Sequence, residues 1–378
     1  MAKTSFVQSP AKIKVVGLGG GGSNAVTRMV REEIRGVEFI AMNTDAQALA
    51  ITEAPIRFQL GEKLTRGLGA GGDHNVGMKA TEESREEIQQ LLAEADMVFL
   101  TAGMGGGTGT GSIPIVAEIA KRSGALTIAI VTKPFGFEGL HRKKVAEDGV
   151  IRLMGKVDTL IIIPNDRLLT LCDQTTTIEN AFRIADDVLR HGVQAISEVI
   201  TVPGLINLDF ADVKTIMKDA GPAWMSIGYG SGKSRAVDAA KDALASPLLD
   251  VSIRGARGVL FNVVGNKNIT LQEVNQAAQV IKQAVDPDAN IIFGVAYDER
   301  MDKDIKITLI ATGFASAGII SSMQDDEIAK LLKSLKSEDE LDTPSFLRRS
   351  LFNQRRTMVT PTTTVKQTAA TPTEQKVS

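Results

Sequence analysis

Nearly continuous apolar runs alternate with longer amphipathic stretches through the first half of the chain. The apolar runs, rich in Val, Ile and Leu, lie at residues 12–18, 37–43, 97–102, 125–131 and 159–164. Such runs are typical of strands buried on both faces of a parallel sheet. Helical spacing of apolar residues marks the stretches at 23–34, 76–93, 113–123 and 138–155. The alternation predicts an α/β fold, with a doubly wound, mostly parallel sheet over residues 12–175.

One long central helix is predicted next. Residues 178–201 contain no proline, and apolar or small residues recur at intervals of three and four, at Phe182, Ala185, Leu189, Gly192, Ile196 and Val199. At 1.5 Å per residue this helix is about 36 Å long, which is enough to bridge two domains. We assign residues 176–219 to this helix and the acidic loop after it.

The second half of the chain predicts an α+β domain over residues 220–316. Four apolar runs lie at 222–230, 258–265, 290–298 and 305–313, with only two helical stretches between them, at 234–245 and 270–284. Parallel neighbours need a crossover helix, so fewer helices than gaps implies a mixed sheet.

The two ends of the chain lack the apolar pattern of a packed domain. We expect a flexible segment over 1–11, a charged helix or linker over 317–341 and a peptide suited to partner binding over 342–356. Residues 357–378, with eight threonines, are predicted to be a disordered tail.

Composition narrows the classes of protein. The formal charge of −2 argues against nucleic-acid binding through bulk charge. Cys172 is the only cysteine, so no intrachain disulfide forms, which is typical of a reducing cytosol. No signal peptide and no apolar run of about 20 residues is present, so we expect a cytoplasmic protein without a transmembrane segment.

The first candidate site is the loop VVGLGGGGSNA. Gly17, Gly19 and Gly22 satisfy G-x-G-x-x-G between a strand and a helix, and Asp45 ends the second strand. This pattern fits a dinucleotide fingerprint with its ribose-binding acid. A dinucleotide-dependent oxidoreductase is therefore one hypothesis.

The second candidate site, AGMGGGTGTGS at 102–112, favours another ligand. A dinucleotide fold gathers its pyrophosphate at one glycine turn, whereas this sheet has two. Glycines allow successive N–H groups to face an anion, and each helix N-terminus adds its dipole. Two such turns suit a chain of phosphates, with hydroxyl donors from Thr108 and Thr110. Pro114 is expected in the first turn of the following helix, and a plain glycine hinge is the alternative.

A third glycine stretch, GYGSGKS at 228–234, resembles a phosphate-binding Walker loop. That pattern requires glycine five residues before Gly232, where this chain has Ile227. We interpret the stretch as a strand-to-helix turn.

GGGTGTG at 105–111 resembles the signature loop of the tubulin/FtsZ superfamily. GGGGSNA, MNTDAQAL, TKPFGFEG, IPNDRLL and NLDFADV follow that family's order between residues 12 and 313, so the chain resembles the bacterial FtsZ family. The resemblance implies a tubulin-like GTPase that binds GTP or GDP with Mg²⁺. It also implies head-to-tail homopolymers that form the cytokinetic (Z) ring beneath the membrane at midcell. A scaffold that keeps the fold without hydrolysis is the alternative.

The resemblance also implies which residues bind GTP. They are Gly20, Gly21, Gly22, Ser23, Asn24, Thr44, Asp45, Ala70, Gly71, Gly72, Gly105, Gly106, Gly107, Thr108, Gly109, Thr132, Glu138, Arg142, Asn165, Phe182 and Asp186. Glu138 and Arg142 match ribose contacts, and at i and i+4 they also suit an ordinary ion pair.

Three of these side chains match the family's guanine contacts. A carboxylate at Asp186 accepts from guanine N1–H and its 2-amino group together, and the neighbouring Asp187 remains an alternative. Phe182 either stacks on the base or belongs to the apolar stripe of the central helix. Asn165 completes the set.

Asp209 and Asp212 in NLDFADV are candidates for catalysis. Three residues apart, they share one face at the start of a predicted helix. Aspartates there also cap helices, which is the structural alternative. The resemblance implies that they act in trans, over the γ-phosphate of the next subunit, with no metal bound by the protein itself.

DTPSFLRR at 342–349 resembles the peptide that binds membrane tethers and regulatory division proteins. The implied contacts are Asp342, Pro344, Phe346, Leu347, Arg348 and Arg349. A solvated basic patch is the alternative. The short preceding linker and the threonine-rich extension depart from the family pattern, as does GGDHNVG, where the family has Asn-Pro-Glu and where we expect His74 at the surface.

Overall fold

The computed structural model describes residues 11–172, 175–201, 209–246, 253 and 255–314. The predictions for residues 1–10, 317–341, 342–356 and 357–378 lie outside these described residues.

Six parallel strands form the first part of the sheet. They are β1 (Ile13–Leu18), β2 (Val37–Asn43), β3 (Ile56–Gln59), β4 (Met97–Gly103), β5 (Leu126–Lys133) and β6 (Thr159–Pro164). The spatial order is β3-β2-β1-β4-β5-β6, and Val16 of β1 pairs with Ile40 of β2 and Leu100 of β4. The chain order reverses direction at β1 and β4, which is the topological switch point of a doubly wound sheet.

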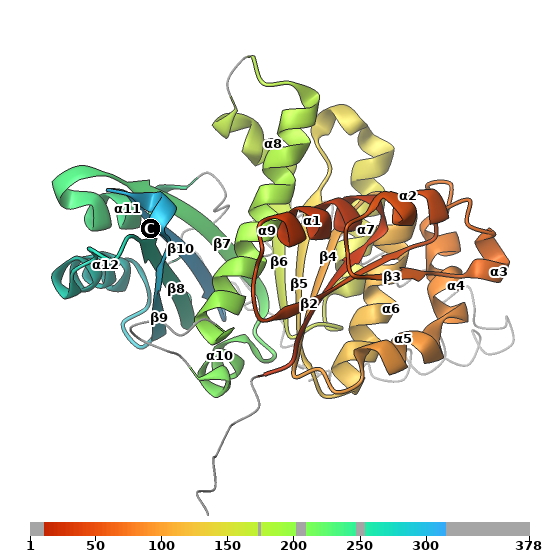
Figure 1. The fold of residues 1–378 in the computed structure, drawn as a ribbon, viewed down its shortest axis with the longest axis horizontal. Coiled ribbons are helices and arrows are strands. Elements are labelled where there is room, and N and C mark those ends of the chain that lie inside the picture. Colours follow the sequence, from red (N-terminus) through yellow and green to blue (C-terminus); the bar gives the residue numbers. More distant parts are fainter. Residues whose placement is uncertain (1–10, 173–174, 202–208, 247–252, 254, 315–378) are drawn as a thin grey trace, which may run out of the picture. The chain divides into compact units, whose positions relative to one another are not determined.

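Helices follow most strands of this sheet. They are α1 (Gly19–Arg31), α2 (Ala46–Ile51), α3 (Glu62–Thr65), α4 (His74–Glu83), α5 (Arg85–Leu92), α6 (Thr108–Arg122), α7 (Leu140–Leu153), α8 (Asn165–Leu168), the long α9 (Ile178–Thr201) and α10 (Phe210–Met217). Figure 1 shows α9 running beside the sheet from α8 toward α10.

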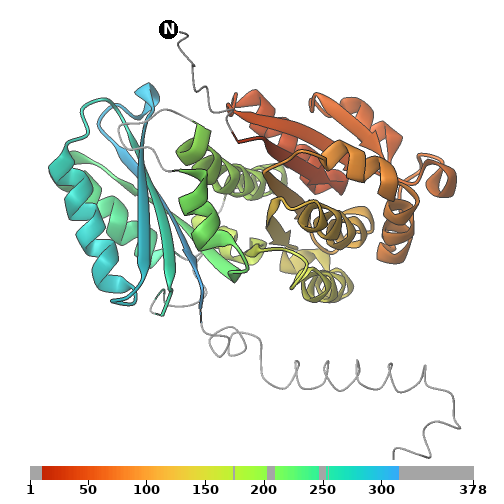
Figure 2. The ribbon, with the colours of Figure 1, turned by 90° about the horizontal axis from the view of Figure 1, so that it is seen from below.

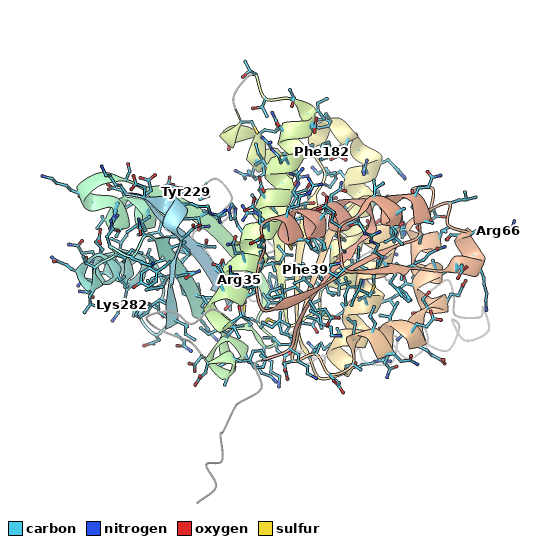
Figure 3. All side chains as sticks on the ribbon, in the orientation of Figure 1. Arg35, Phe39, Arg66, Phe182, Tyr229 and Lys282 are labelled. Carbon is cyan, nitrogen blue, oxygen red and sulfur yellow. The ribbon has the colours of Figure 1, made fainter. Side chains whose placement is uncertain are left out.

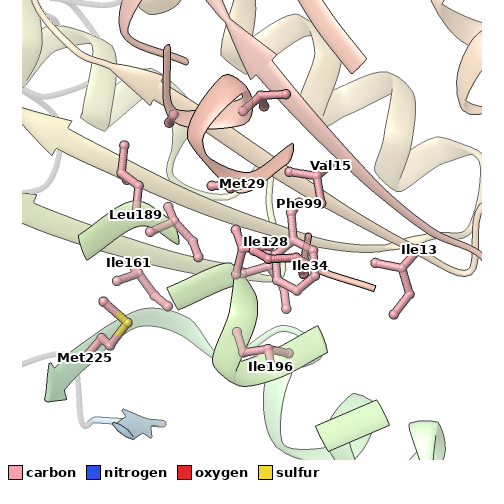
Figure 4. Packing of buried hydrophobic residues seen from close by; sticks show 14 of the residues in the cluster. Ile13, Val15, Met29, Ile34, Phe99, Ile128, Ile161, Leu189, Ile196 and Met225 are labelled. Atoms are coloured by element: carbon pink, nitrogen blue, oxygen red, sulfur yellow. The ribbon is translucent and has the colours of Figure 1, made fainter. Parts of the chain in front are cut away.

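Two hydrophobic cores cover the two faces of the sheet. Along β4, Met97 and Phe99 pack with α1, α9 and α10, while Val98 and Leu100 pack with α4 to α7. The first of these cores also takes in Met225 from the second half of the chain, and Figure 4 shows its packed side chains. Burial on both faces explains why the strands lack polar alternation.

The second half adds four strands to the same sheet. They are β7 (Gly221–Gly230), β8 (Gly258–Gly265), β9 (Asn290–Tyr297) and β10 (Ile305–Thr312), in the order β6-β7-β10-β8-β9. β7 continues the sheet in parallel from β6, whereas β10 is antiparallel to β7 and β8. The predicted mixed sheet is confirmed, and it is joined edge to edge with the parallel part.

Helices α11 (Arg235–Ala245) and α12 (Leu271–Ala284) pack on one face of these strands, as Figure 2 shows from a second direction. A Cβ on Gly228 would collide with the Ala239 carbonyl, and one on Gly230 with that of Arg235. These glycines therefore serve strand–helix packing. A short 3₁₀ turn, Gly232–Ser234, leads into α11, so the interpretation of GYGSGKS as a turn is confirmed.

Several predicted boundaries were wrong at the glycine loops. α1 begins at Gly19 rather than at residue 23, and α6 begins at Thr108 rather than at residue 113. Pro114 therefore lies inside α6, and not in its first turn. The stretch 76–93 is two helices that meet at Ser84. Glycine has low intrinsic helix propensity, and here tertiary packing overrides it.

Candidate functional site

The loops after β1, β2 and β4 meet at one edge of the sheet. Because carboxyl ends of neighbouring parallel strands lie together, the turn before α1 and the turn before α6 are adjacent. A Cβ on Gly19 would lie 2.8 Å from the Gly109 nitrogen, and one on Gly21 would lie 3.3 Å from the Gly103 nitrogen. The two glycine loops are thus in direct backbone contact.

The second and third predicted loops join the same edge. The hydroxyls of Thr44 and Thr108 lie 2.6 Å apart in a buried hydrogen bond. Gly69 N donates to Thr44 O, so residues 44–45 and 68–72 are held together. A Cβ on Gly107 would lie 3.0 Å from the carbonyl carbon of Gly72. These four loops, three of which bear glycines, therefore surround one region.

The glycines of these loops fall into two groups. Some pack against backbone, since a Cβ on Gly109 would lie 3.0 Å from the Gly103 carbonyl oxygen and one on Gly111 would collide with the His74 carbonyl. Others face open space, because a Cβ would meet no atom within 4 Å at Gly20, Gly71, Gly72 and Gly106. Only the second group leaves room for a ligand.

Thr110 and Asp45 are used by the protein itself. The Thr110 hydroxyl accepts from Gly105 N at 2.8 Å, so it shapes the loop. Asp45 caps α2 by accepting from Gln47 N at 2.8 Å and Ala48 N at 3.1 Å. The acid that a dinucleotide ribose would need is therefore engaged, which weakens the oxidoreductase hypothesis.

Two buried polar atoms lack a partner at this edge. Ser23 Oγ, on α1, and Asn165 Oδ1, at the start of α8, are fully buried without a hydrogen bond. A buried polar group without a partner is costly. Both residues were predicted from the sequence to bind a ligand. A bound ligand would satisfy them by accepting from the Ser23 hydroxyl and by donating an N–H or O–H to Asn165 Oδ1.

Three aromatic rings lie beside Asn165. Phe135 stacks on Phe137 with centroids 5.0 Å apart, and Phe182 meets Phe135 edge to face at 5.3 Å. Phe182 is 40% exposed, so it lies outside the buried stripe of α9, which includes Ala181 and Ala185. Figure 3 labels Phe182 toward the α8 end of α9.

The structure distinguishes the two neighbouring aspartates of α9. Asp186 is 13% exposed and accepts from Arg28 Nε of α1 at 3.0 Å, whereas Asp187 forms an ion pair with Arg190. Burial raises the pKa of Asp186 to about 6, and the Arg28 hydrogen bond opposes that rise. Asp186 faces the helix that begins in the first glycine loop.

Glu138 and Arg142 form an ion pair at 3.1 Å. Glu138 ends a 3₁₀ turn, where its side chain also accepts from Phe135 N, and Arg142 lies in α7. A Cβ on Gly105 would lie 2.7 Å from the Arg142 carbonyl oxygen, so this pair borders the signature loop. Thr132, the last residue but one of β5, pairs with Gly103.

Asp209 and Asp212 lie at the other end of the sheet. Both are exposed at the start of α10, and Asp209 occupies the N-cap position without a side-chain capping bond. The far end of α10 contacts Thr159, the first residue of β6, while Asn165 follows the last residue of that strand. β6 has six residues, so at about 3.3 Å per residue its two ends are about 20 Å apart.

Some residues at this edge were missed from the sequence. Arg28 contacts Asp186, and Asp166 accepts from Gly136 N at 2.7 Å and so holds the turn that carries Phe137. Arg28 lies one helical turn after Asn24, a spacing that places both on one face of α1. This spacing from Asn24 is the sequence signal by which Arg28 could have been predicted.

The described residues contain neither a metal-binding cluster nor a membrane-spanning helix. No group of three or more His, Cys, Asp or Glu side chains there is arranged to hold a metal ion. None of the helices within the described ranges is long and apolar enough to cross a membrane.

Comparison with known proteins identifies similar folds and sequences. The model of the Tubulin/FtsZ family GTPase domain matches residues 12–173, and that of the FtsZ family C-terminal domain matches 221–315. An empty FtsZ dimer from M. jannaschii is 47% identical, with a TM-score of 0.79 over 82% of this chain and 90% of that chain. GDP-bound CetZ1 from Haloferax volcanii is 18% identical, with a TM-score of 0.72 over 85% of this chain and 99% of that one, which shows likeness of fold alone.

The two groups of glycines predict opposite effects of substitution. Gly106→Asp should leave the melting temperature near wild type, because space is open there, yet weaken nucleotide binding more than about 100-fold through repulsion of phosphate. Gly111→Ala should lower the free energy of unfolding by about 1–3 kcal/mol, because its Cβ meets backbone of α4.

Denaturant unfolding and a fluorescent-nucleotide titration measure the two effects. Gly106→Ala is the matched control, since it adds a side chain without charge. Normal binding by Gly106→Asp together with normal stability of Gly111→Ala would contradict this division of the loop.

Proposed function

This chain belongs to the Tubulin/FtsZ family, as a GTPase of the cytoskeletal cell-division class, and we propose that it is a bacterial member that polymerises head to tail into the cytokinetic ring. The proposal of a polymer rests on one observation. The glycine loops are separated from Asp209 and Asp212 by the length of the parallel strands. A complete hydrolytic site then requires two subunits.

Phosphate binding is assigned to the four loops predicted from the sequence. Gly20, Gly71, Gly72 and Gly106 leave open space at the ends of two helices whose dipoles favour an anion. Ser23 Oγ, buried without a partner, supports a role as donor to a phosphate oxygen. The packing glycines Gly22 and Gly109 position the loops, while their backbone groups remain part of the proposed site.

The guanine pocket is assigned to α8 and α9. Ionised Asp186 accepts from the two donors of the guanine edge, a pattern that adenine lacks. The unpartnered Asn165 Oδ1 and the exposed ring of Phe182 support the remaining base contacts. The alternative Asp187 is engaged with Arg190. Glu138 and Arg142 are assigned to the ribose beside Gly105.

A magnesium ion is proposed to accompany the nucleotide. The buried hydroxyls of Thr44 and Thr108 suit a hard cation, but a residue set for a protein-held metal is lacking in the described part of the chain. Phosphate oxygens and water would supply its other ligands. The ion would neutralise charge on the phosphates.

Hydrolysis is proposed to occur in trans. The exposed carboxylates of Asp209 and Asp212 would lie over the γ-phosphate of the neighbouring subunit, where they orient and polarise the attacking water. Asp209 makes no side-chain cap, which supports the catalytic role over the structural one. A relative from M. jannaschii was solved as a dimer, which supports self-association.

Membrane attachment is proposed to be indirect. Tether and regulatory proteins would bind through the 342–349 peptide, with Phe346 and Leu347 as apolar anchors. The filament would then lie in the cytoplasm beneath the midcell membrane.

The proposed guanine contact predicts a pH dependence. A carboxyl with a raised folded pKa is stabilised by protonation, so this contribution to stability is present below the ordinary value of 3.8 and lost as pH rises through about 6. Binding has the opposite sign, because the base needs the ionised form. GDP affinity should be constant above pH 7 and fall by up to about tenfold per pH unit below 6.

Calorimetric titration with GDP between about pH 5 and about pH 8, from about one unit below that pKa to about two units above it, measures this dependence. Asp186→Asn is the control, since it retains the titration of the nucleotide and loses that of the carboxyl. An unchanged pH profile in Asp186→Asn would argue against Asp186 as the base contact.

Catalysis in trans predicts the behaviour of Asp212→Ala. The variant should bind GTP with wild-type affinity, because its own pocket is intact, and lose about 100-fold or more in turnover. Phosphate release measures turnover. Wild-type specific activity should rise with protein concentration above a threshold. A flat concentration dependence, or full turnover by Asp212→Ala, would refute the shared site.

The tether assignment predicts the effect of deleting residues 342–378. GTP hydrolysis should stay within about twofold of wild type, since no residue of the proposed nucleotide or catalytic site is removed, while localisation to the division ring is lost. Fluorescence microscopy of tagged protein tests this, with deletion of 357–378 as the matched control. Rings formed by the longer deletion would show that the peptide is dispensable.

A further inference from the structure

α10, the helix that carries the acidic pair, is too short to hold its position alone. Its eight residues are fewer than an isolated helix needs in water, so tertiary contacts must fix it. Val213 and Met217 lie in the core shared by α9, β5 and the second-half strands, while Asp209 and Asp212 stay exposed. The buried face therefore determines where the acids lie.

The last turn of α10 is held by two threonine hydroxyls. Thr159 Oγ1 donates to Met217 O at 2.5 Å, and Thr312 Oγ1 lies 3.3 Å from Ile216 O. Both threonines are almost completely buried, with exposures of 0% and 1%. Carbonyls in the last turn of a helix have no partner within it, so these hydroxyls satisfy groups that water does not reach.

The two threonines belong to different parts of the sheet. Thr159 opens β6 in the parallel part, and Thr312 ends β10 in the mixed part. The Thr312 hydrogen is shared with Gly258 O, also at 3.3 Å, at the start of β8. α10 is thus bonded at its C-terminal end to both halves of the molecule.

The chain leaving α10 is fixed as well. Asp219 adopts a left-handed conformation, with φ of 50°, and its side chain accepts from Lys121 of α6 at 2.8 Å. Lys121 also pairs with the buried Asp158, which precedes Thr159. The C-terminal end of α10 therefore also fixes its orientation, about 12 Å along the helix from Asp209 and about 8 Å from Asp212 at about 1.5 Å per residue.

We propose that Thr159 and Thr312 are positioning residues for hydrolysis, which align the exposed acids of α10 with the nucleotide of the neighbouring subunit. The inference rests on the proposed trans-acting site. Both are buried and hydrogen-bonded to the last turn of α10, so they would act only through that helix. A reacting group displaced by about 1 Å can cost up to about 100-fold in rate, so loss of these bonds should appear in turnover before it appears in nucleotide binding.

Isosteric variants test the inference on the full chain. Thr159→Val and Thr312→Val each remove a hydroxyl at nearly constant volume and should lower polymer-stimulated turnover about threefold to tenfold, with GTP affinity and sedimentation near wild type. Thr159→Ser keeps a hydroxyl at this position and should therefore keep turnover near the wild-type value. Thr127→Val is the matched control, because that buried hydroxyl bonds Ala125 O and not α10.

A mixing experiment locates the defect on one side of the interface. Gly106→Asp lacks a working pocket but has an intact α10, while Asp212→Ala has an intact pocket but lacks a working acid. The double variant Thr159→Val/Thr312→Val should regain turnover when mixed with Gly106→Asp, which supplies α10. It should gain none when mixed with Asp212→Ala, because neither partner then supplies a placed acid.

The mixing experiment distinguishes failure of this inference from failure of the proposed function. Turnover regained with Asp212→Ala, or absent with Gly106→Asp, overturns the inference, as does a loss in Thr127→Val equal to that in Thr159→Val. Thr159→Val and Thr312→Val are also mixed singly with each partner variant. The inference is therefore still tested if the double variant does not fold. Full turnover by Asp212→Ala alone refutes the proposed function itself, and the inference with it.

Discussion

The close approach of two helix starts to two neighbouring strands is the constraint on which this structure depends. β1 and β4 lie side by side at the switch point, and α1 and α6 leave them through backbone contacts that exclude a Cβ at Gly22 and crowd one at Gly109. Two helix dipoles consequently end at the same place. The glycines open toward solvent, such as Gly106, are available for a phosphate chain only because the packing glycines bring the loops together.

The same sheet sets the distance between the two halves of the proposed chemistry. Parallel strands present all their carboxyl ends at one edge, so the loops gather there, and α9 returns the chain along the sheet to the other edge. A helix of 24 residues spans about 36 Å, more than the length of β6. The acids of α10 are consequently carried away from the subunit's own loops.

Regular elements were predicted closely because their signal is local. β2, β6, β8 and α9 have the predicted boundaries, since apolar runs and helical spacing are read along the chain itself. The starts of α1 and α6 were wrong because glycine signals a loop locally, while the contacts that make Gly22 and Gly111 helical come from distant segments. Asp186 and Asp187 are equivalent in sequence, and only the position of Arg28 on another helix distinguishes them.

Under the proposed function, the division of the site between opposite edges would couple assembly to hydrolysis without a moving loop. A monomer with nucleotide at the glycine loops would have its acids at the far edge of the sheet, and no rotation of a side chain spans about 20 Å. Contact with a second copy, acids to loops, would supply the missing group in one step. α10 is hydrogen-bonded to both β6 and β10. The position of its acids therefore depends on how the two halves of the subunit are arranged. Under the proposed function, turnover would then depend on that arrangement as well as on contact between subunits.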